Sequence, residues 1–128
     1  MKSDAGPAET AERLVAAATS RGMSVMARVD HAAAAETVGL KLGPTEVLMI
    51  GNPVAGTPLM QARQTAGIDL PLKALVWQEE TGQTFVAYND PQWIAARHGL
   101  TAESVIGRMT TVLAAIAREA AVAQGDSP

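Results

Sequence analysis

The stretch RVDHAAAAETVGLKLGPTEVLMIGNPVAG, residues 28–56, contains the end of one strand, a short helix and a second strand. Asp30 directly precedes HAAAAETV and Gly39, where its carboxylate would accept amide hydrogens at the start of a helix. TEVLMIG follows Pro44, and its unbroken apolar run is typical of a central strand covered on both faces. This stretch therefore predicts a domain that mixes strands with helices.

The residues before this stretch add a helix and complete the first strand. AETAERLVAAATSRG has apolar residues at helical spacing and reaches Gly22, which suits a left-handed helix stop. MSVMARV then changes to a period of two, which predicts a strand with four residues on one face: Met23, Val25, Ala27 and Val29.

The residues after this stretch predict two helix starts and a hairpin. Thr57 followed by Pro58 gives a cap and a proline at the first helical position, so a helix is expected over PLMQARQTA. LKALVWQ and TFVAYN flank an acidic turn with Gly82 and predict two adjacent antiparallel strands. Asp90 followed by Pro91 repeats the cap signal before QWIAARH.

A final helix is expected over residues 101–121, with an apolar stripe at a spacing of 3.6 residues. The stripe consists of Val105, Ile106, Met109, Val112, Leu113, Ile116 and Ala120. The order of elements predicts an α+β fold in which about four strands form a mainly antiparallel sheet with helices packed on it. We expect a single domain over residues 9–122, with flexible ends at residues 1–8 and 123–128.

Composition excludes several classes of function. The net charge is −3 and the Lys and Arg residues are scattered, which argues against the basic surface that binds nucleic acid. The chain has no cysteine, so disulfides, thiolate nucleophiles and Cys-ligated metals are excluded. The first residues lack a secretory signal and no apolar run is long enough to span a membrane. We therefore expect a soluble, cytoplasmic protein without nucleic-acid or membrane partners.

Loops at the strand ends carry the candidate ligand-binding residues, which are Asp30, His31, Asn52, Pro53, Asp69, Tyr88 and Asp90. If these ends share one side of the sheet, His31 would face Asn52 and Tyr88 across a shallow pocket, with Asp69 at its rim. An imidazole there could bind a small ligand or exchange a proton near neutral pH. The structural alternative is that Asp30 and Asp90 only cap helices, and that the residues beside Pro53 and Asp69 only form turns.

His31 is also the candidate metal ligand. With no thiolate in the chain, a metal would have to use His31 or His98 together with Asp or Glu. Haem is compatible with His31 on ligand type alone, although the chain has no Cys-x-x-Cys-His motif. The methionines are expected to fill the core rather than to bind copper.

Several motifs in fixed order resemble a known family. They are Asp-His-Ala at residues 30–32, Gly-Asn-Pro at 51–53, Asp-Leu-Pro at 69–71 and Tyr-Asn-Asp-Pro at 88–91. Over roughly residues 10 to 100 the chain resembles the bacterial and archaeal family known as domain of unknown function 302. The resemblance implies a compact α+β fold with an antiparallel sheet, assembled as a homodimer, and it implies no settled activity. Some members have a cysteine where Gly51 stands, so a thiol-based role does not apply to this chain.

Two functional hypotheses follow. The first is a homodimeric module that binds a small ligand, such as a metal ion, haem or a metabolite, near the Asp-His and Gly-Asn-Pro motifs. The second is an enzyme that uses His31 as its acid-base group, with Asp69 or Asp90 as partner.

Overall fold

The structure, a computed structural model, describes residues 1–101 and 103–123. The strands are β1 (Lys2–Ser3), β2 (Ser24–Asp30), β3 (Thr45–Gly51), β4 (Leu72–Gln78) and β5 (Thr84–Tyr88). The helices are α1 (Pro7–Ser20), α2 (His31–Glu36), α3 (Pro53–Ala62), α4 (Pro91–His98) and α5 (Glu103–Ala121), and η1 (Gln64–Asp69) is a 3₁₀ helix. Among the described residues, none of the helices is long and apolar enough to cross a membrane.

All strand pairs are antiparallel, and the order across the sheet is β1-β5-β4-β3-β2. The predicted α+β class is confirmed, with five strands instead of about four. The additional strand is β1, in the segment 1–8 that was expected to be flexible. Lys2 lies opposite Phe85, and the Met1 ammonium group donates a hydrogen bond to the Val86 carbonyl at 2.9 Å. Pairing with β5 therefore places Lys2 and Ser3 at the edge of the sheet.

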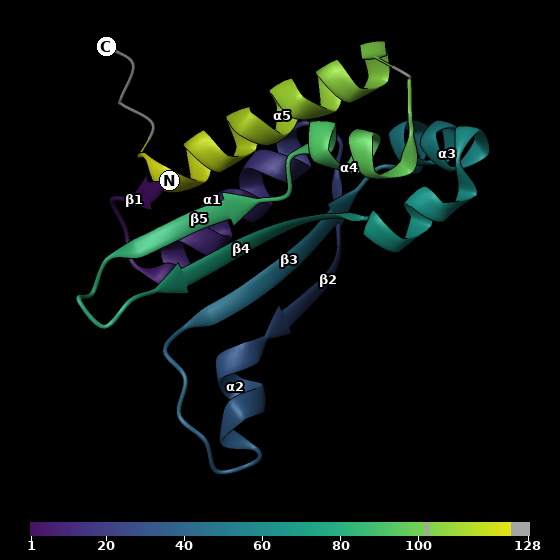
Figure 1. The fold of residues 1–128 in the computed structure, drawn as a ribbon. Helices are drawn as coiled ribbons and strands as arrows, with labels where there is room; N and C mark the ends of the chain where they lie inside the picture. The colour runs from purple at the N-terminus through teal and green to yellow at the C-terminus, as the bar shows by residue number, and fades with distance from the viewer. Residues whose placement is uncertain (102, 124–128) are drawn as a thin grey trace, which may run out of the picture.

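The core lies between the sheet and helices α1 and α5, which contact each other over one face of the sheet (Figure 1). Leu14 of α1, Leu48 of β3 and Leu113 of α5 are all almost fully buried. The predicted stripe on the last helix is confirmed, because its buried residues include Ile106, Met109, Leu113, Ile116 and Ala120. Ala102, in the first turn of the predicted last helix, lies outside the described residues. So do residues 124–128 of the predicted flexible end 123–128.

No helix of the described residues forms such a layer on the other face of the sheet, which we call the open face. On β3, Leu48 and Ile50 are buried against the helices, whereas Val47 and Met49 point to the open face and are half-buried. Within a single chain, helices therefore cover this strand on one face only, and not on both faces as predicted. The run is continuously apolar because the open face is itself apolar, with half-buried Leu75, Trp77 and Phe85 on the neighbouring strands.

Strand β2 contains a bulge that breaks the predicted alternation. Val25 lies opposite Ile50 and Ala27 lies opposite Met49, which leaves Met26 as an extra residue. Val25 therefore points to the helices while Ala27 points to the open face, and the four residues predicted on one face do not share it. A single inserted residue shifts the side-chain alternation of everything that follows it.

Three helices begin at side-chain caps. Asp30 Oδ1 accepts the Ala33 amide at 2.9 Å and Asp90 Oδ1 accepts the Gln92 amide at 2.8 Å, so both predicted caps are confirmed. The predicted start at Thr57 was wrong, because α3 begins at Pro53 with Asn52 as its cap, and Pro58 lies inside the helix. Asn52 followed by Pro53 offers the same cap-and-proline signal five residues earlier.

Candidate functional site

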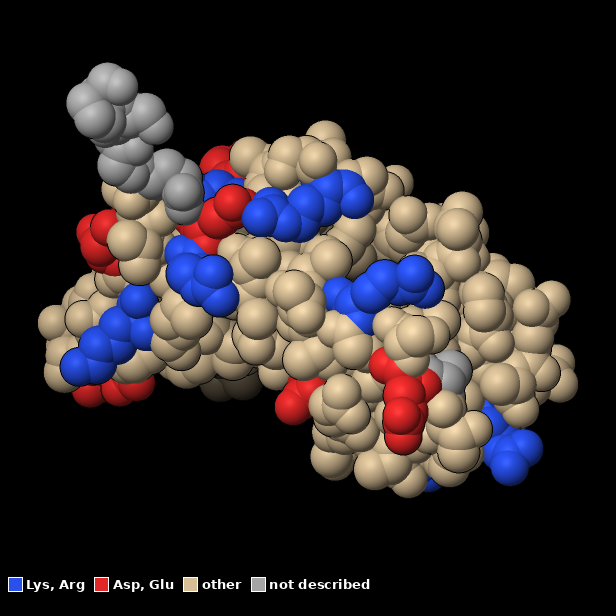
Figure 2. Space-filling model, turned by 90° about the horizontal axis from the view of Figure 1, so that it is seen from above, with Lys and Arg blue, Asp and Glu red and all other residues tan. Residues whose placement is uncertain are grey.

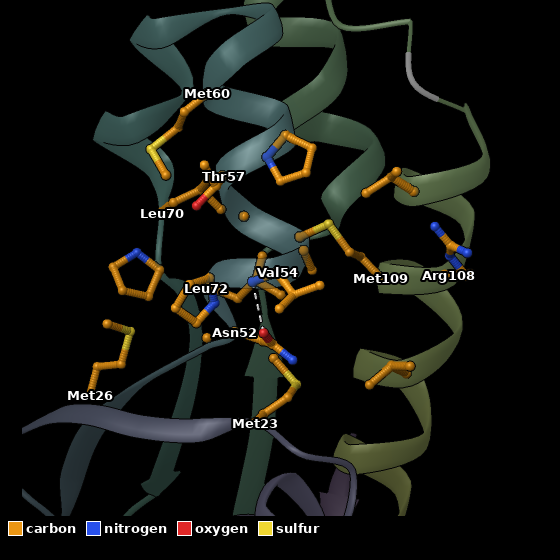
Figure 3. A pocket seen from close by; sticks show the side chains of 18 of the residues that line it. Met23, Met26, Asn52, Val54, Thr57, Met60, Leu70, Leu72, Arg108 and Met109 are labelled. Carbon is orange, nitrogen blue, oxygen red and sulfur yellow. Dashed lines mark hydrogen bonds between the residues drawn. The ribbon is translucent and has the colours of Figure 1, made fainter.

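A cavity of about 610 Å³ lies between α3, α5 and the adjoining ends of β2 and β3 (Figure 3). Four methionines line it, and we call it the methionine cavity: Met23, Met26, Met60 and Met109. Its volume falls within the roughly 300–1,000 Å³ that is usual for small-molecule sites. Thioether side chains are flexible and polarisable, so this lining can adapt to apolar ligands of different shape.

Each wall of the methionine cavity comes from a different part of the chain. Helix α5 contributes Val105, Met109 and Val112, which share one helix face because they are four and three residues apart. The bulge in β2 turns Met26 toward the cavity. At Gly51 a Cβ atom would lie 3.0 Å from the Met26 sulfur, so the glycine permits this close approach. A cysteine at that position would require Met26 to move.

Asn52 and Pro53 of the Gly-Asn-Pro motif also line the methionine cavity. The Asn52 side-chain oxygen accepts the Val54 amide at 2.9 Å (Figure 3). Its Nδ2 donates to the Gly22 carbonyl at 3.4 Å. Both ends of this side chain are thus engaged in holding the start of α3 to the start of β2. Asn52 shapes the wall of the cavity rather than presenting a free polar group to it.

His31 lies elsewhere. It lines a shallower hollow of about 420 Å³ on the sheet, together with Tyr88, Asn89 and Lys73. In the β2–β3 pairing, Asp30 lies opposite Glu46 while Ser24 lies opposite Gly51, so the Asp-His and Gly-Asn-Pro motifs occupy opposite ends of one hairpin. Six residue-to-residue steps along β2 separate the two ends by about 20 Å. The structure therefore brings His31 near Tyr88 and separates it from Asn52.

Asp69 pairs with His98 instead of with His31. The Asp69 carboxylate is buried, with His98 Nε2 at 2.5 Å from Oδ2 and Arg97 Nη1 at 3.3 Å from Oδ1. Because a carboxylate only accepts, Nε2 donates to it, and in the neutral imidazole Nδ1 then accepts from the Thr65 hydroxyl at 3.1 Å. This chain of hydrogen bonds ties η1 to α4. Asp69 is therefore neither a turn residue nor a partner for His31.

The remaining candidates have structural contacts. Asp90 caps α4, and Asp30 caps α2. Among the described residues, His31 makes no hydrogen bond to a carboxylate, and no group of three or more His, Asp and Glu side chains is placed to hold a metal ion.

Charged side chains near the methionine cavity differ in their pairing. Arg21 lines the cavity and binds Glu119 through two hydrogen bonds of 2.5 and 2.9 Å, which lower the pKa of Glu119. Arg108 of α5 also lines the cavity, and it is exposed. Figure 2 shows Lys and Arg as separate patches among Asp and Glu on the face seen there, rather than as one basic surface.

Sequence reasoning identified Asn52 and Pro53, which line the methionine cavity, but missed its other walls and the Asp69–His98 pair. The spacing of Val105, Met109 and Val112 indicated a helix face turned inward, which is a second signal of the cavity. Asp69 and His98 are separated by 28 intervening residues, and no local pattern connects them.

A family model described as "Domain of unknown function DUF302" matches residues 1–116. Two proteins named fluoride-specific ion channel FluC 1, from Brucella suis and Brucella abortus, are each 47% identical to this chain over 116 residues, which is 89% of its length. The matched part is 46% and 43% of those proteins, so this chain spans less than half of their length. The crystal structure of an uncharacterized conserved DUF302 protein from Bacillus stearothermophilus superposes with a TM-score of 0.83 at 21% identity, covering 94% of both chains.

Proposed function

This chain belongs to the family of domains of unknown function DUF302, and we propose that it is a small-molecule binding module whose ligand occupies the methionine cavity. The observation that carries the proposal is the cavity itself, a preformed apolar space of ligand size. The Gly-Asn-Pro motif forms part of its wall, which supports one of the two locations expected from the sequence. The Asp-His motif supports α2 and lies outside the cavity.

Filling the cavity tests this proposal. Gly56 lines the cavity, and a Cβ atom placed there meets only Leu70, at 4.0 Å. The Gly56→Phe variant would therefore direct a phenyl ring into the cavity. Gly107 of α5 has open space around its Cβ position and does not line the cavity, so Gly107→Phe is the matched control.

The neutral dye Nile red is the probe. We expect its fluorescence to rise on binding to the wild-type chain and to Gly107→Phe, and to stay near the buffer value with Gly56→Phe. Equal dye binding by all three proteins would contradict the proposal. So would the absence of dye binding by the wild type.

We also propose that the chain forms a homodimer through the open face. Val38, Leu40 and Leu42, which follow α2, are each more than half exposed. An apolar segment and an apolar sheet face on the same chain can cover each other reciprocally in a two-fold pair. The charges beside these two surfaces are compatible with such a pair. Glu36 of α2 lies next to the apolar segment and Lys73 lies on the open face, so opposite charges could meet across the interface.

Light scattering tests the dimer. The wild type is expected at about twice the chain mass of 13.3 kDa. Leu75→Asp on the open face should give the monomer mass, whereas Thr111→Asp on the exposed side of α5 should not change it. A monomeric wild type at high micromolar concentration would rule the dimer out.

A role in fluoride transport is a second candidate function, favoured by the names of the Brucella relatives. This chain matches less than half the length of those proteins. The second candidate is therefore a domain that works together with a fluoride channel, and not the channel itself. A strain lacking the chain should grow less well in sodium fluoride, and expression of the wild-type chain should restore growth. Equal growth with and without the chain would remove this candidate and leave the ligand-binding proposal intact.

A further inference from the structure

We infer that the ligand of the methionine cavity is a long-chain carboxylate, with its apolar chain inside the cavity and its carboxylate on Arg108. The inference rests on the proposed function and specifies the ligand. It depends on three features of the cavity: the state of its cations, the state of its neutral polar groups and the shape of its α5 wall.

The two arginines that line the cavity are in different states. Arg21 donates to Glu119 through both terminal guanidinium nitrogens, Nη1 and Nη2, so its charge is already compensated. Arg108 makes no hydrogen bond or ion pair to a carboxylate within residues 1–101 and 103–123. Its guanidinium group can therefore bind an anionic ligand in the planar, two-pronged geometry that suits a carboxylate.

The neutral polar groups of the lining do not favour a ligand with many polar atoms. Two neutral polar side chains line the cavity. Asn52 uses its oxygen on Val54 and its nitrogen on Gly22, and the exposed Thr57 adds a single hydroxyl. A ligand rich in hydroxyl or amide groups would bury most of those groups without partners, which is unfavourable. The lining instead matches a ligand that is apolar along its body and charged at one end.

The position of Arg108 on α5 agrees with such a ligand. Arg108 precedes Met109 and follows Val105 by three residues, so it borders the apolar face that α5 turns to the cavity. Because Arg108 is exposed, a carboxylate bound to it would stay close to water. The ligand's hydrocarbon tail would then extend into the cavity between α3 and α5.

Competition between two ligands of equal length tests the inference. Nile red bound to the wild type is displaced with dodecanoate or with dodecanol, both below the concentration at which dodecanoate forms micelles. We expect dodecanoate to bind about tenfold more tightly than dodecanol, because hydrogen bonds to a charged group are among the stronger ones. Arg108→Gln should abolish this preference while dodecanol binding is retained.

Two variants control for charge and folding. Arg118 is exposed on α5 and does not line the cavity, so Arg118→Gln should keep the preference for dodecanoate. Arg108→Lys keeps the positive charge and should retain part of the preference for dodecanoate over dodecanol.

The outcomes separate the inference from the proposed function. If the wild type binds dodecanoate and dodecanol equally, or if Arg108→Gln keeps the preference, the assignment of the carboxylate to Arg108 is wrong and the apolar ligand site stands. If neither compound displaces Nile red from a wild type that binds it, a long-chain ligand is excluded. If Nile red itself does not bind, the proposed function fails first.

Discussion

His98 Nε2 and Asp69 Oδ2 lie 2.5 Å apart, and the two side chains are only 7% and 9% exposed. This pair joins η1 to α4 across 28 intervening residues. Arg97 adds a second donor to the same carboxylate at 3.3 Å. A buried carboxylate held by two donors stabilises the native contacts of both segments, and the loss of either its charge or a donor leaves polar groups unpaired.

Asp69→Asn should therefore destabilise the domain. The amide nitrogen replaces one acceptor by a donor that faces Nε2–H or the Arg97 guanidinium group. We expect a loss of about 3–5 kcal/mol in the free energy of unfolding, the cost of breaking a buried pair by removing one partner. Urea denaturation measures it.

Asp90→Asn is the matched control for this change. Asp90 only caps α4, and asparagine caps a helix about as well as aspartate. A loss in Asp69→Asn no larger than in Asp90→Asn would contradict a stabilising role for the pair.

Helix α5 should depend on its buried stripe. Leu113 is 1% exposed in the core, and Leu113→Ala is expected to cost about 2–5 kcal/mol in unfolding free energy through lost burial and a residual cavity. Thr111→Ala on the exposed side of the same helix should change stability by less than about 0.5 kcal/mol. Thermal denaturation of both variants measures the difference. If both substitutions changed stability equally little, α5 would not be packed on the core.

The cap at Asp30 should act locally. Its carboxylate accepts the Ala33 amide at 2.9 Å, and none of the residues of α2 is buried. Asp30→Ala should weaken α2 by about 0.5–2 kcal/mol, seen as faster hydrogen exchange of the Ala33 amide, whereas Asp30→Asn should retain protection. Identical exchange in the two variants would mean that the cap does not stabilise α2.

The Arg21–Glu119 pair should make stability depend on pH. Hydrogen bonds from Arg21 hold the pKa of Glu119 below its usual value of 4.5 in the folded state. A carboxylate with a depressed folded pKa stabilises the fold above the unfolded pKa, and this contribution is lost as the pH falls through the folded pKa.

Comparison of Glu119→Gln with the wild type measures this effect. The wild type should be more stable by about 0.2–1 kcal/mol at neutral pH, as is usual for a partly exposed pair. The difference should disappear as the solution is acidified well below pH 4.5. Glu103→Gln, near the start of the same helix, is the control, and a difference that persisted in acid would exclude this pair as its source.

Local signals predicted the fold well. The caps at Asp30 and Asp90, the hairpin around Gly82 and the stripe on α5 each depend on residues close in sequence, and the structure confirms them. Strand β1 was not predicted, because Lys2 and Ser3 form a strand only by pairing with residues more than 80 positions away.

The candidate site was harder to predict because it depends on strand direction. In an antiparallel sheet, consecutive strands run in opposite directions, so their C-terminal ends lie at opposite ends of the strands' length. This separates His31, after β2, from Asn52, after β3. The bulge at Met26 could not be inferred from the alternation of MSVMARV, since an alternating pattern does not reveal an inserted residue. Asn52 and Pro53 were identified as candidates, and they do line a cavity, although as its wall.

The bulge in β2 also affects how copies of this protein can aggregate. A sheet with a long, flat edge can add strands from further copies without limit, as in amyloid fibres. Here one edge is the two-residue strand β1, and the other is interrupted at Met26 and carries the charged residues Arg28 and Asp30. Both edges are therefore poor templates for the addition of a strand from another copy. Growth into fibres through the native sheet is disfavoured.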